Sequence, residues 1–110
     1  MARKHISPSR AVSDALQVLG DHVRVARTAR RIPMRVLAQR VGLDPRVVSA
    51  VERGDPSVSI GNAIAVAHAA GVPLFGGENP EQLARTKSHS SALVALLPSR
   101  VRETSLGDFL

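Results

Sequence analysis

The chain has 110 residues, of which 44% are hydrophobic and 2% aromatic, and it contains no cysteine. This length fits one domain with extensions, and small aliphatic residues favour a helical bundle over a β-sandwich. The lack of cysteine excludes disulfides and thiolate metal sites, and it predicts a reducing, cytoplasmic setting. No apolar run approaches the roughly 20 residues of a membrane span, and none follows the basic start as in a secretory signal, so we expect a soluble protein.

The positive charge, a formal net +6, is concentrated in one part of the chain. Between Arg24 and Arg53, eight arginines oppose only Asp44 and Glu52, whereas the remaining segments are nearly neutral. Arginines outnumber lysines thirteen to two, and the planar guanidinium suits phosphate and guanine better than an ammonium does. This basic block predicts a nucleic acid as partner, with a merely solubilising surface as the alternative.

The first predicted helix carries an apolar stripe with alternating spacings of four and three residues. It starts at Ser7-Pro8 or at Ser13-Asp14 and runs to about Arg31, because Pro33 disfavours helical geometry in the residue before it. The stripe consists of Val12, Leu16, Leu19, Val23 and Ala26.

Two short helices follow. The second begins at Pro33 and ends before Gly42, with its inward residues at Val36, Leu37 and Val41. The third begins at Pro45 behind the N-cap Asp44 and runs to Arg53, with its inward residues at Val48 and Val51.

The fourth predicted helix is capped by Ser59, runs from Ile60 to about Ala70 and ends at Gly71. Its predicted inner face is narrow and consists of Ile60, Ala63, Ile64 and Ala67. A short extended piece over 72–75 leads to a boundary at Gly76-Gly77.

Beyond that boundary the pattern weakens. A short helix is expected from Asn79-Pro80-Glu81 to about Lys87, followed by a polar stretch and then an uncharged apolar run, Ala92–Leu97, that Pro98 stops. The last residues, Phe109-Leu110, are also apolar. A segment of this size is too small to build its own core.

Two short helices joined by Gly42-Leu43-Asp44 inside the basic block form the arrangement of a DNA-binding helix-turn-helix, locked by Ala38, Val48 and Val51. At these positions the sequence resembles the Xre and lambda-repressor-like family over about Leu16–Leu74. The residues that carry this resemblance are Leu19-Gly20, Val23-Arg24, Ala26-Arg27, Leu37-Ala38, Val41-Gly42-Leu43, Val48-Ser49, Val51-Glu52-Arg53-Gly54 and Ala65-Val66-Ala67.

The resemblance implies an all-α, lambda-repressor-like domain of four or five helices that binds double-stranded DNA. Within the family, the stretch Glu52–Gly61 is most similar to HipB-type antitoxins. Such proteins are homodimers that repress their own operon at a palindromic operator, and their C-terminal part contacts a kinase-like toxin.

The resemblance also implies roles for individual residues. Arg46 is the expected base reader, bidentate to guanine O6 and N7, with a phosphate contact as its alternative. Pro45, Ser49 and Ala50 share the exposed face of the recognition helix with it, and Val47 and Ala50 can at most touch a thymine methyl. Expected phosphate ligands are Arg35, Arg40, Arg53 and Asn62, with a solvated surface charge as the alternative for each arginine. The expected structural ion pair is Arg27 with Glu52.

One departure from the family concerns two glutamines. Many relatives have Gln where this chain has Met34 and Pro45, and neither residue can make the corresponding bonds to phosphate and adenine. Fewer direct base contacts remain, so we expect the operator to be read partly through DNA shape.

Nothing in the sequence predicts an enzyme, a metal or a cofactor. The four histidines (5, 22, 68 and 89) lack metal-binding spacing. The chain contains neither a phosphate-cradling Gly-Lys-Ser/Thr loop nor a Gly-x-Ser-x-Gly elbow, and its carboxylates are scattered.

The predicted organisation is a basic arm over 1–10, a helix-turn-helix DNA-binding domain over 11–76 and a tail over 77–110. In the arm, Ala2–His5 either contacts DNA or is disordered. In the tail, Ala92–Leu97 and Phe109-Leu110 bind a groove on a partner, or Ala92–Leu97 packs on its own domain or a second copy, or the segment is a flexible extension.

We therefore expect a sequence-specific repressor that is the antitoxin of a HipA/HipB-like toxin–antitoxin operon. The alternatives are a stand-alone regulator without a toxin, and an interaction module that binds no DNA.

Overall fold

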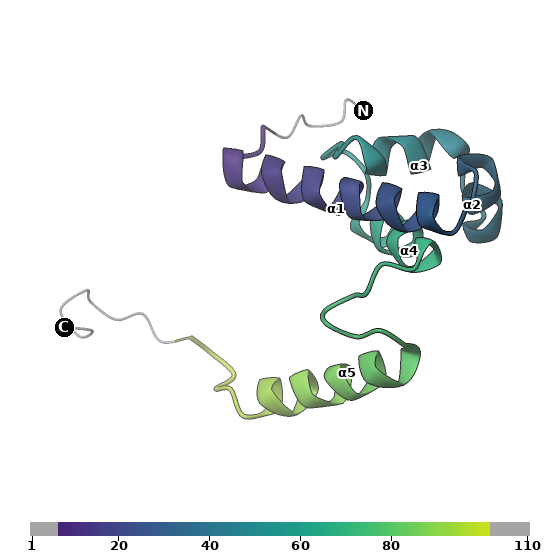
Figure 1. The fold of residues 1–110 in the computed structure, drawn as a ribbon. Helices are drawn as coiled ribbons and strands as arrows, with labels where there is room; N and C mark the ends of the chain where they lie inside the picture. The colour runs from purple at the N-terminus through teal and green to yellow at the C-terminus, as the bar shows by residue number, and fades with distance from the viewer. Residues whose placement is uncertain (1–6, 102–110) are drawn as a thin grey trace.

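The computed structural model describes residues 7–101, which form five α-helices and no strand (Figure 1). The prediction of an all-α fold is confirmed. Helices α1 to α4 pack together, and α5 lies apart from them at the end of a connecting segment (Figure 1). The helices are α1 Arg10–Ala29, α2 Met34–Val41, α3 Pro45–Glu52, α4 Ile60–Ala70 and α5 Pro80–Ala95.

Polar caps and glycines set most of the helix ends. The side chains of Asp44 and Ser59 accept hydrogen bonds from backbone amides in the first turns of α3 and α4, as the sequence predicts. Gly42 and Gly71 end α2 and α4 in the left-handed region, with φ of 69° and 95°. These caps place the end of α2, the start of α3 and both ends of α4.

The predicted ends of α1 are wrong by a few residues. Ser9, rather than Ser7 or Ser13, caps the helix, because its side chain accepts from the Val12 amide at 3.3 Å. The helix stops at Ala29 rather than near Arg31. Arg31 itself has a left-handed backbone conformation, with a φ of 55°, and lies in the turn after the helix. Pro33 is likewise the N-cap of α2 rather than its first helical residue.

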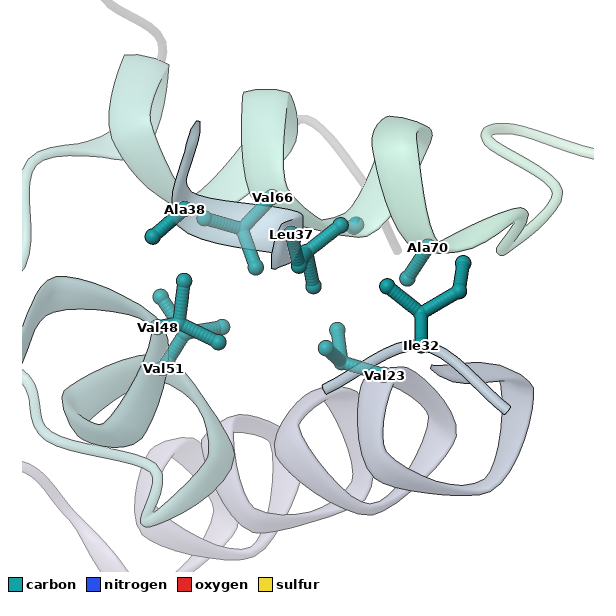
Figure 2. Close-up of a cluster of buried hydrophobic side chains, with 9 residues drawn as sticks. Val23, Ile32, Leu37, Ala38, Val48, Val51, Val66 and Ala70 are labelled. Atoms are coloured by element: carbon teal, nitrogen blue, oxygen red, sulfur yellow. The ribbon is translucent and has the colours of Figure 1, made fainter. Parts of the chain in front are cut away.

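One buried cluster joins α1 to α4 (Figure 2). Side chains from all four helices and from the α1–α2 connection meet in it, so the four helices share one core. Of the predicted stripe on α1, Val23 is fully buried, whereas Val12 is exposed, because it lies beyond the cluster. The cluster consists of Val23, Ile32, Leu37, Ala38, Val48, Val51, Val66, Ala67 and Ala70.

Helices α1 and α3 approach closely at Gly20. A Cβ on Gly20 would lie 2.5 Å from the Glu52 carbonyl oxygen and 2.6 Å from that of Val51. Real Cβ atoms essentially never come so near to a backbone atom, so only glycine allows this spacing. The approach holds α3 against α1 and thereby sets the orientation of the helix-turn-helix.

The prediction of which residues of α4 face inward is partly wrong. Ile60 is 79% exposed and Ile64 is also exposed, while Val66, Ala67 and Ala70 are buried. Small alanines allow the helices to pack tightly, so the buried face follows the alanines and Val66 rather than the two isoleucines.

Helix α5 is longer than predicted. It continues through Ser88–Ser91 into the apolar run, and none of its residues is buried. The alternative in which Ala92–Leu97 packs on its own domain is wrong, because Leu93, Val94, Leu96 and Leu97 are each at least half exposed. The predictions for Ala2–His5 and Phe109-Leu110 concern residues outside the part that the structure describes.

Candidate nucleic-acid interface

The predicted helix-turn-helix consists of α2, the turn Gly42–Asp44 and α3. The Leu43 amide donates to the Ala38 carbonyl at 2.9 Å and the Gly42 amide to the Gln39 carbonyl at 3.3 Å, which satisfies the last carbonyls of α2. The buried side chains of Ala38 and Val48 belong to the shared cluster. The turn and the cluster hold the two helices at a fixed angle. A helix-turn-helix motif needs this fixed angle to present its second helix in one orientation.

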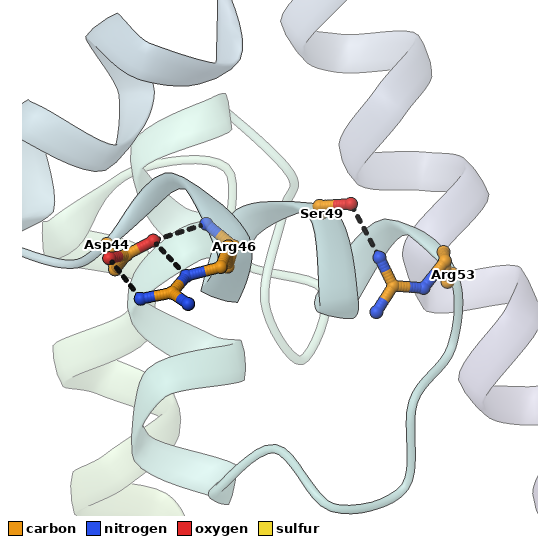
Figure 3. Close-up of polar contacts among 4 residues, drawn as sticks. All are labelled: Asp44, Arg46, Ser49 and Arg53. Atoms are coloured by element: carbon orange, nitrogen blue, oxygen red, sulfur yellow. Dashed lines mark hydrogen bonds and ion pairs between the residues drawn. The ribbon is translucent and has the colours of Figure 1, made fainter.

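The first turn of α3 presents Arg46 to solvent, where it pairs with Asp44 (Figure 3). The Arg46 Nε donates to Asp44 Oδ1 at 3.1 Å, and Nη2 donates to Oδ2 at 3.1 Å. This side-chain hydrogen bond lowers the pKa of Asp44 below its ordinary value and raises that of Arg46. Both groups are therefore charged at neutral pH, and the guanidinium lies at the end of α3 that a recognition helix inserts into DNA.

Further along the same helix, Ser49 and Arg53 contact each other. The Arg53 Nη1 donates to Ser49 Oγ at 2.6 Å (Figure 3). The structure thus brings together a residue expected to read a base and one expected to bind phosphate. Arg53 is exposed, so its remaining donors face solvent.

A hollow of about 420 Å³ lies between the start of α3 and the start of α4. It combines Arg46, Val47 and Ala50 with Asn62, which is half-buried, so four of the expected DNA-binding residues border one concavity. The hollow is lined by Asp44, Arg46, Val47, Ala50, Ser57, Val58, Ser59 and Asn62.

The expectation that Ala50 lies on the exposed face of α3 is wrong. Ala50 is only 9% exposed. The loop after α3 turns back beside it, and the Asp55 amide donates to the Ala50 carbonyl at 3.0 Å. Ala50 therefore forms the floor of the hollow. Pro45 and Arg46 are exposed, and Val47 and Ser49 are half-buried.

The remaining predicted phosphate ligands are Arg35 and Arg40, both exposed on α2. Five residues separate them, which is about 140° around a helix, so they lie on opposite flanks of its buried side.

Arg27 and Glu52 join α1 to the end of α3. Nε of Arg27 lies 2.6 Å from one carboxylate oxygen, and Nη2 lies 3.0 Å from the other. Arg27 Nη1 also donates to the Ile32 carbonyl, and hydrogen bonding to Glu52 raises the pKa of Arg27. Both side chains are largely buried, so this arginine is part of the fold rather than of the exposed basic surface.

Sequence reasoning missed the second role of Asp44. The residue was expected only as a helix cap, but its carboxylate also pairs with Arg46. The spacing of an acidic N-cap two residues before an arginine is the signal that points to such a pair.

Residues 7–101 contain no cluster of three or more His, Asp or Glu side chains placed to hold a metal ion. In the same part of the chain, no helix is long and apolar enough to cross a membrane.

The comparisons with known proteins agree with this geometry. Residues 23–76 match the family described as Helix-turn-helix, and the match spans the last third of α1 and all of α2, α3 and α4. No curated protein and no solved structure matches the chain.

Proposed function

We propose that this chain, whose residues 23–76 match the helix-turn-helix family, is a sequence-specific transcriptional repressor. It would bind a palindromic operator as a homodimer. The observation that carries this proposal is the exposed arginine at the start of α3, on the second helix of the motif. An arginine at this position can donate two hydrogen bonds to guanine in the major groove.

Charge supports DNA as the ligand. Seven of the eight arginines between positions 24 and 53 remain for solvent after Arg27 is assigned to its buried pair. Arginine side chains bind the phosphate backbone and give affinity that falls with salt. Arg35, Arg40, Arg53 and Asn62 are the proposed phosphate ligands, while Pro45, Val47 and Ser49 flank Arg46.

We further propose that the protein is an antitoxin of the HipB type, whose C-terminal helix binds a kinase-like toxin. The support is the sequence similarity of Glu52–Gly61 and the exposed apolar end of α5. Leu93, Val94, Leu96 and Leu97 are between 53% and 82% exposed. Such side chains gain stability when a partner covers them.

The first experiment measures binding of the purified protein to DNA from upstream of its own gene and to a scrambled fragment, over a salt series. We expect a preference of about a thousandfold at physiological salt, as is usual for specific binders. Equal, steeply salt-dependent binding to both fragments would contradict autorepression, and no binding at low salt would contradict DNA binding altogether.

The antitoxin proposal is tested separately by capture from the native host. The full chain should retain a kinase-like protein, and a variant that ends at Gly77 should lose it while still binding DNA. If the full chain captures no such protein, the antitoxin proposal is contradicted, and a stand-alone regulator without a toxin remains.

A further inference from the structure

We propose that Asp44 determines base specificity by holding the guanidinium of Arg46 in position to read a guanine. This inference rests on the proposed function and assigns a positioning residue within it.

The two oxygens of the Asp44 carboxylate bind three donors of one residue (Figure 3). Oδ1 accepts from the backbone amide of Arg46 at 2.8 Å and from its Nε at 3.1 Å, and Oδ2 accepts from Nη2 at 3.1 Å. The backbone bond fixes the carboxylate relative to the axis of α3. The side-chain pair is therefore anchored to the helix, unlike an ordinary surface ion pair between two free side chains.

The donors of Arg46 that remain are those a guanine needs. A guanidinium carries five N–H groups, and the pair with Asp44 uses one on Nε and one on Nη2. The edge formed by Nη1 and Nη2 keeps a donor on each nitrogen. These two donors match the O6 and N7 acceptors of guanine in the major groove.

Pairing also reduces the conformational cost of binding. The Arg46 side chain is 91% exposed, and a free arginine at such a position samples many rotamers that must be lost when it binds a base. Asp44 restricts these rotamers before DNA arrives, so less freedom is lost on forming the two bonds to guanine.

The negative charge of Asp44 gives the second part of the effect. It lies at the start of α3, where the helix must approach phosphates, so it weakens contact with DNA of any sequence. A surface that bound only the backbone would gain affinity by losing this charge. Asp44 therefore increases discrimination in two ways, by positioning the base reader and by penalising non-specific complexes.

A capping role alone would not require this residue. Asn and Ser cap helices about as well as Asp does, through one side-chain oxygen. Asp44→Asn keeps that oxygen but replaces the other with an amide that faces the Nη2 donor, and it removes the charge. This variant separates positioning from capping.

The experiment selects binding sites from a random pool of double-stranded DNA with the full chain. Wild type, Asp44→Asn, Arg46→Ala and the double variant are compared. Asp14→Asn, an exposed position on α1, is the control for charge. Asp44→Ser provides a second capping variant, and thermal unfolding checks that each protein is folded.

We expect the wild-type consensus to contain a guanine that Arg46→Ala no longer selects. Asp44→Asn and Asp44→Ser should lower the preference for that guanine by about threefold, less than the loss of the whole bidentate contact would, and leave other positions unchanged. Affinity for scrambled DNA at low salt should rise in both. Adding Asp44→Asn to Arg46→Ala should not change base preference further, and Asp14→Asn should behave like wild type.

Three results would overturn the inference. If Asp44→Asn or a folded Asp44→Ser selects the guanine as strongly as wild type does, Asp44 is only a cap. If Arg46→Ala keeps the wild-type consensus, Arg46 is not the reader, although the proposed function stands. If wild type selects no consensus, the proposed function itself fails, and the inference fails with it.

Discussion

Arg27 and Glu52, 25 residues apart in the sequence, form a two-pronged ion pair that ties the last turn of α1 to the last residue of α3. The side chains are only 13% and 4% exposed. The ion pair stabilises the fold because it compensates the buried carboxylate of Glu52, since a buried charge without its partner is strongly destabilising.

Arg27→Met should therefore lower the free energy of unfolding by about 3 kcal/mol, because Glu52 would be left as an uncompensated buried charge. Chemical denaturation measures the change. Adding Glu52→Leu should recover part of the loss, and Arg24→Met, at an exposed position on the same helix, should change stability by less than about 0.5 kcal/mol. A double variant less stable than the single one would show that packing, not charge, dominates.

Gly20→Ala should destabilise the domain, because the added methyl would collide with the backbone of α3. We expect a loss of about 2 kcal/mol, the range for overpacked cores, despite the better helix propensity of alanine. Gly61→Ala is the matched control. It lies in α4 with open space around its Cβ position, so it should be neutral or stabilise by about 0.5 kcal/mol.

Arg46→Ala and Arg53→Ala should weaken DNA binding in different ways. Loss of a base contact lowers affinity for the operator about tenfold and leaves scrambled DNA almost unaffected. Loss of a phosphate contact weakens both complexes and lowers the salt slope by about 1. Fluorescence anisotropy over a salt series measures both quantities. If the two variants show the same pattern, Arg46 is another phosphate ligand.

The carboxyl of Asp44 should titrate below its ordinary value of 3.8, because the Arg46 side chain and backbone amide both donate to it. Stability from this group is fully present above the unfolded pKa and is lost as the pH falls through the lower folded pKa. Carbon-detected NMR measures the titration. Arg46→Ala should raise the pKa only in part, because the backbone amide remains. An unchanged pKa in that variant would show that the side-chain pair does not persist in solution.

The sequence predicts the helices around the turn well, because caps and glycines mark their ends. Asp44 before Pro45, Ser59 before Ile60, and Gly42 and Gly71 behind their helices act locally, so no tertiary information is needed. The resemblance extends this to the long-range contact between Arg27 and Glu52, which no local pattern indicates.

Two of the errors, on α4 and at Ala50, have tertiary causes. On α4, Ile60 and Ile64 dominate the hydrophobic pattern, but the buried face consists largely of alanines, which carry little hydrophobic signal. The periodicity of α3 predicts an exposed Ala50, because it carries no information on the returning loop that covers this residue. The contact between Arg46 and Asp44 depends on a side-chain rotamer, which sequence periodicity does not specify.

The length of α5 was underestimated for another reason. The polarity of Ser88–Ser91 suggests a break in the sequence pattern, but a polar stretch need not interrupt a helix. No glycine or proline occurs between Glu81 and Leu97, so nothing in the covalent chain stops the helix before Pro98.

Protection against amide hydrogen exchange should differ between α5 and the four packed helices α1 to α4. A 16-residue helix without buried residues is marginal in water on its own, so its amides should exchange through local fraying, while those of Leu37 and Val48 should exchange only on global unfolding. A ligand that covers the apolar end of α5 would slow exchange there and leave the interior of the domain unchanged. The exchange rate along α5 is thus an internal reporter of whether that helix is occupied, and it can be read without knowing the partner in advance.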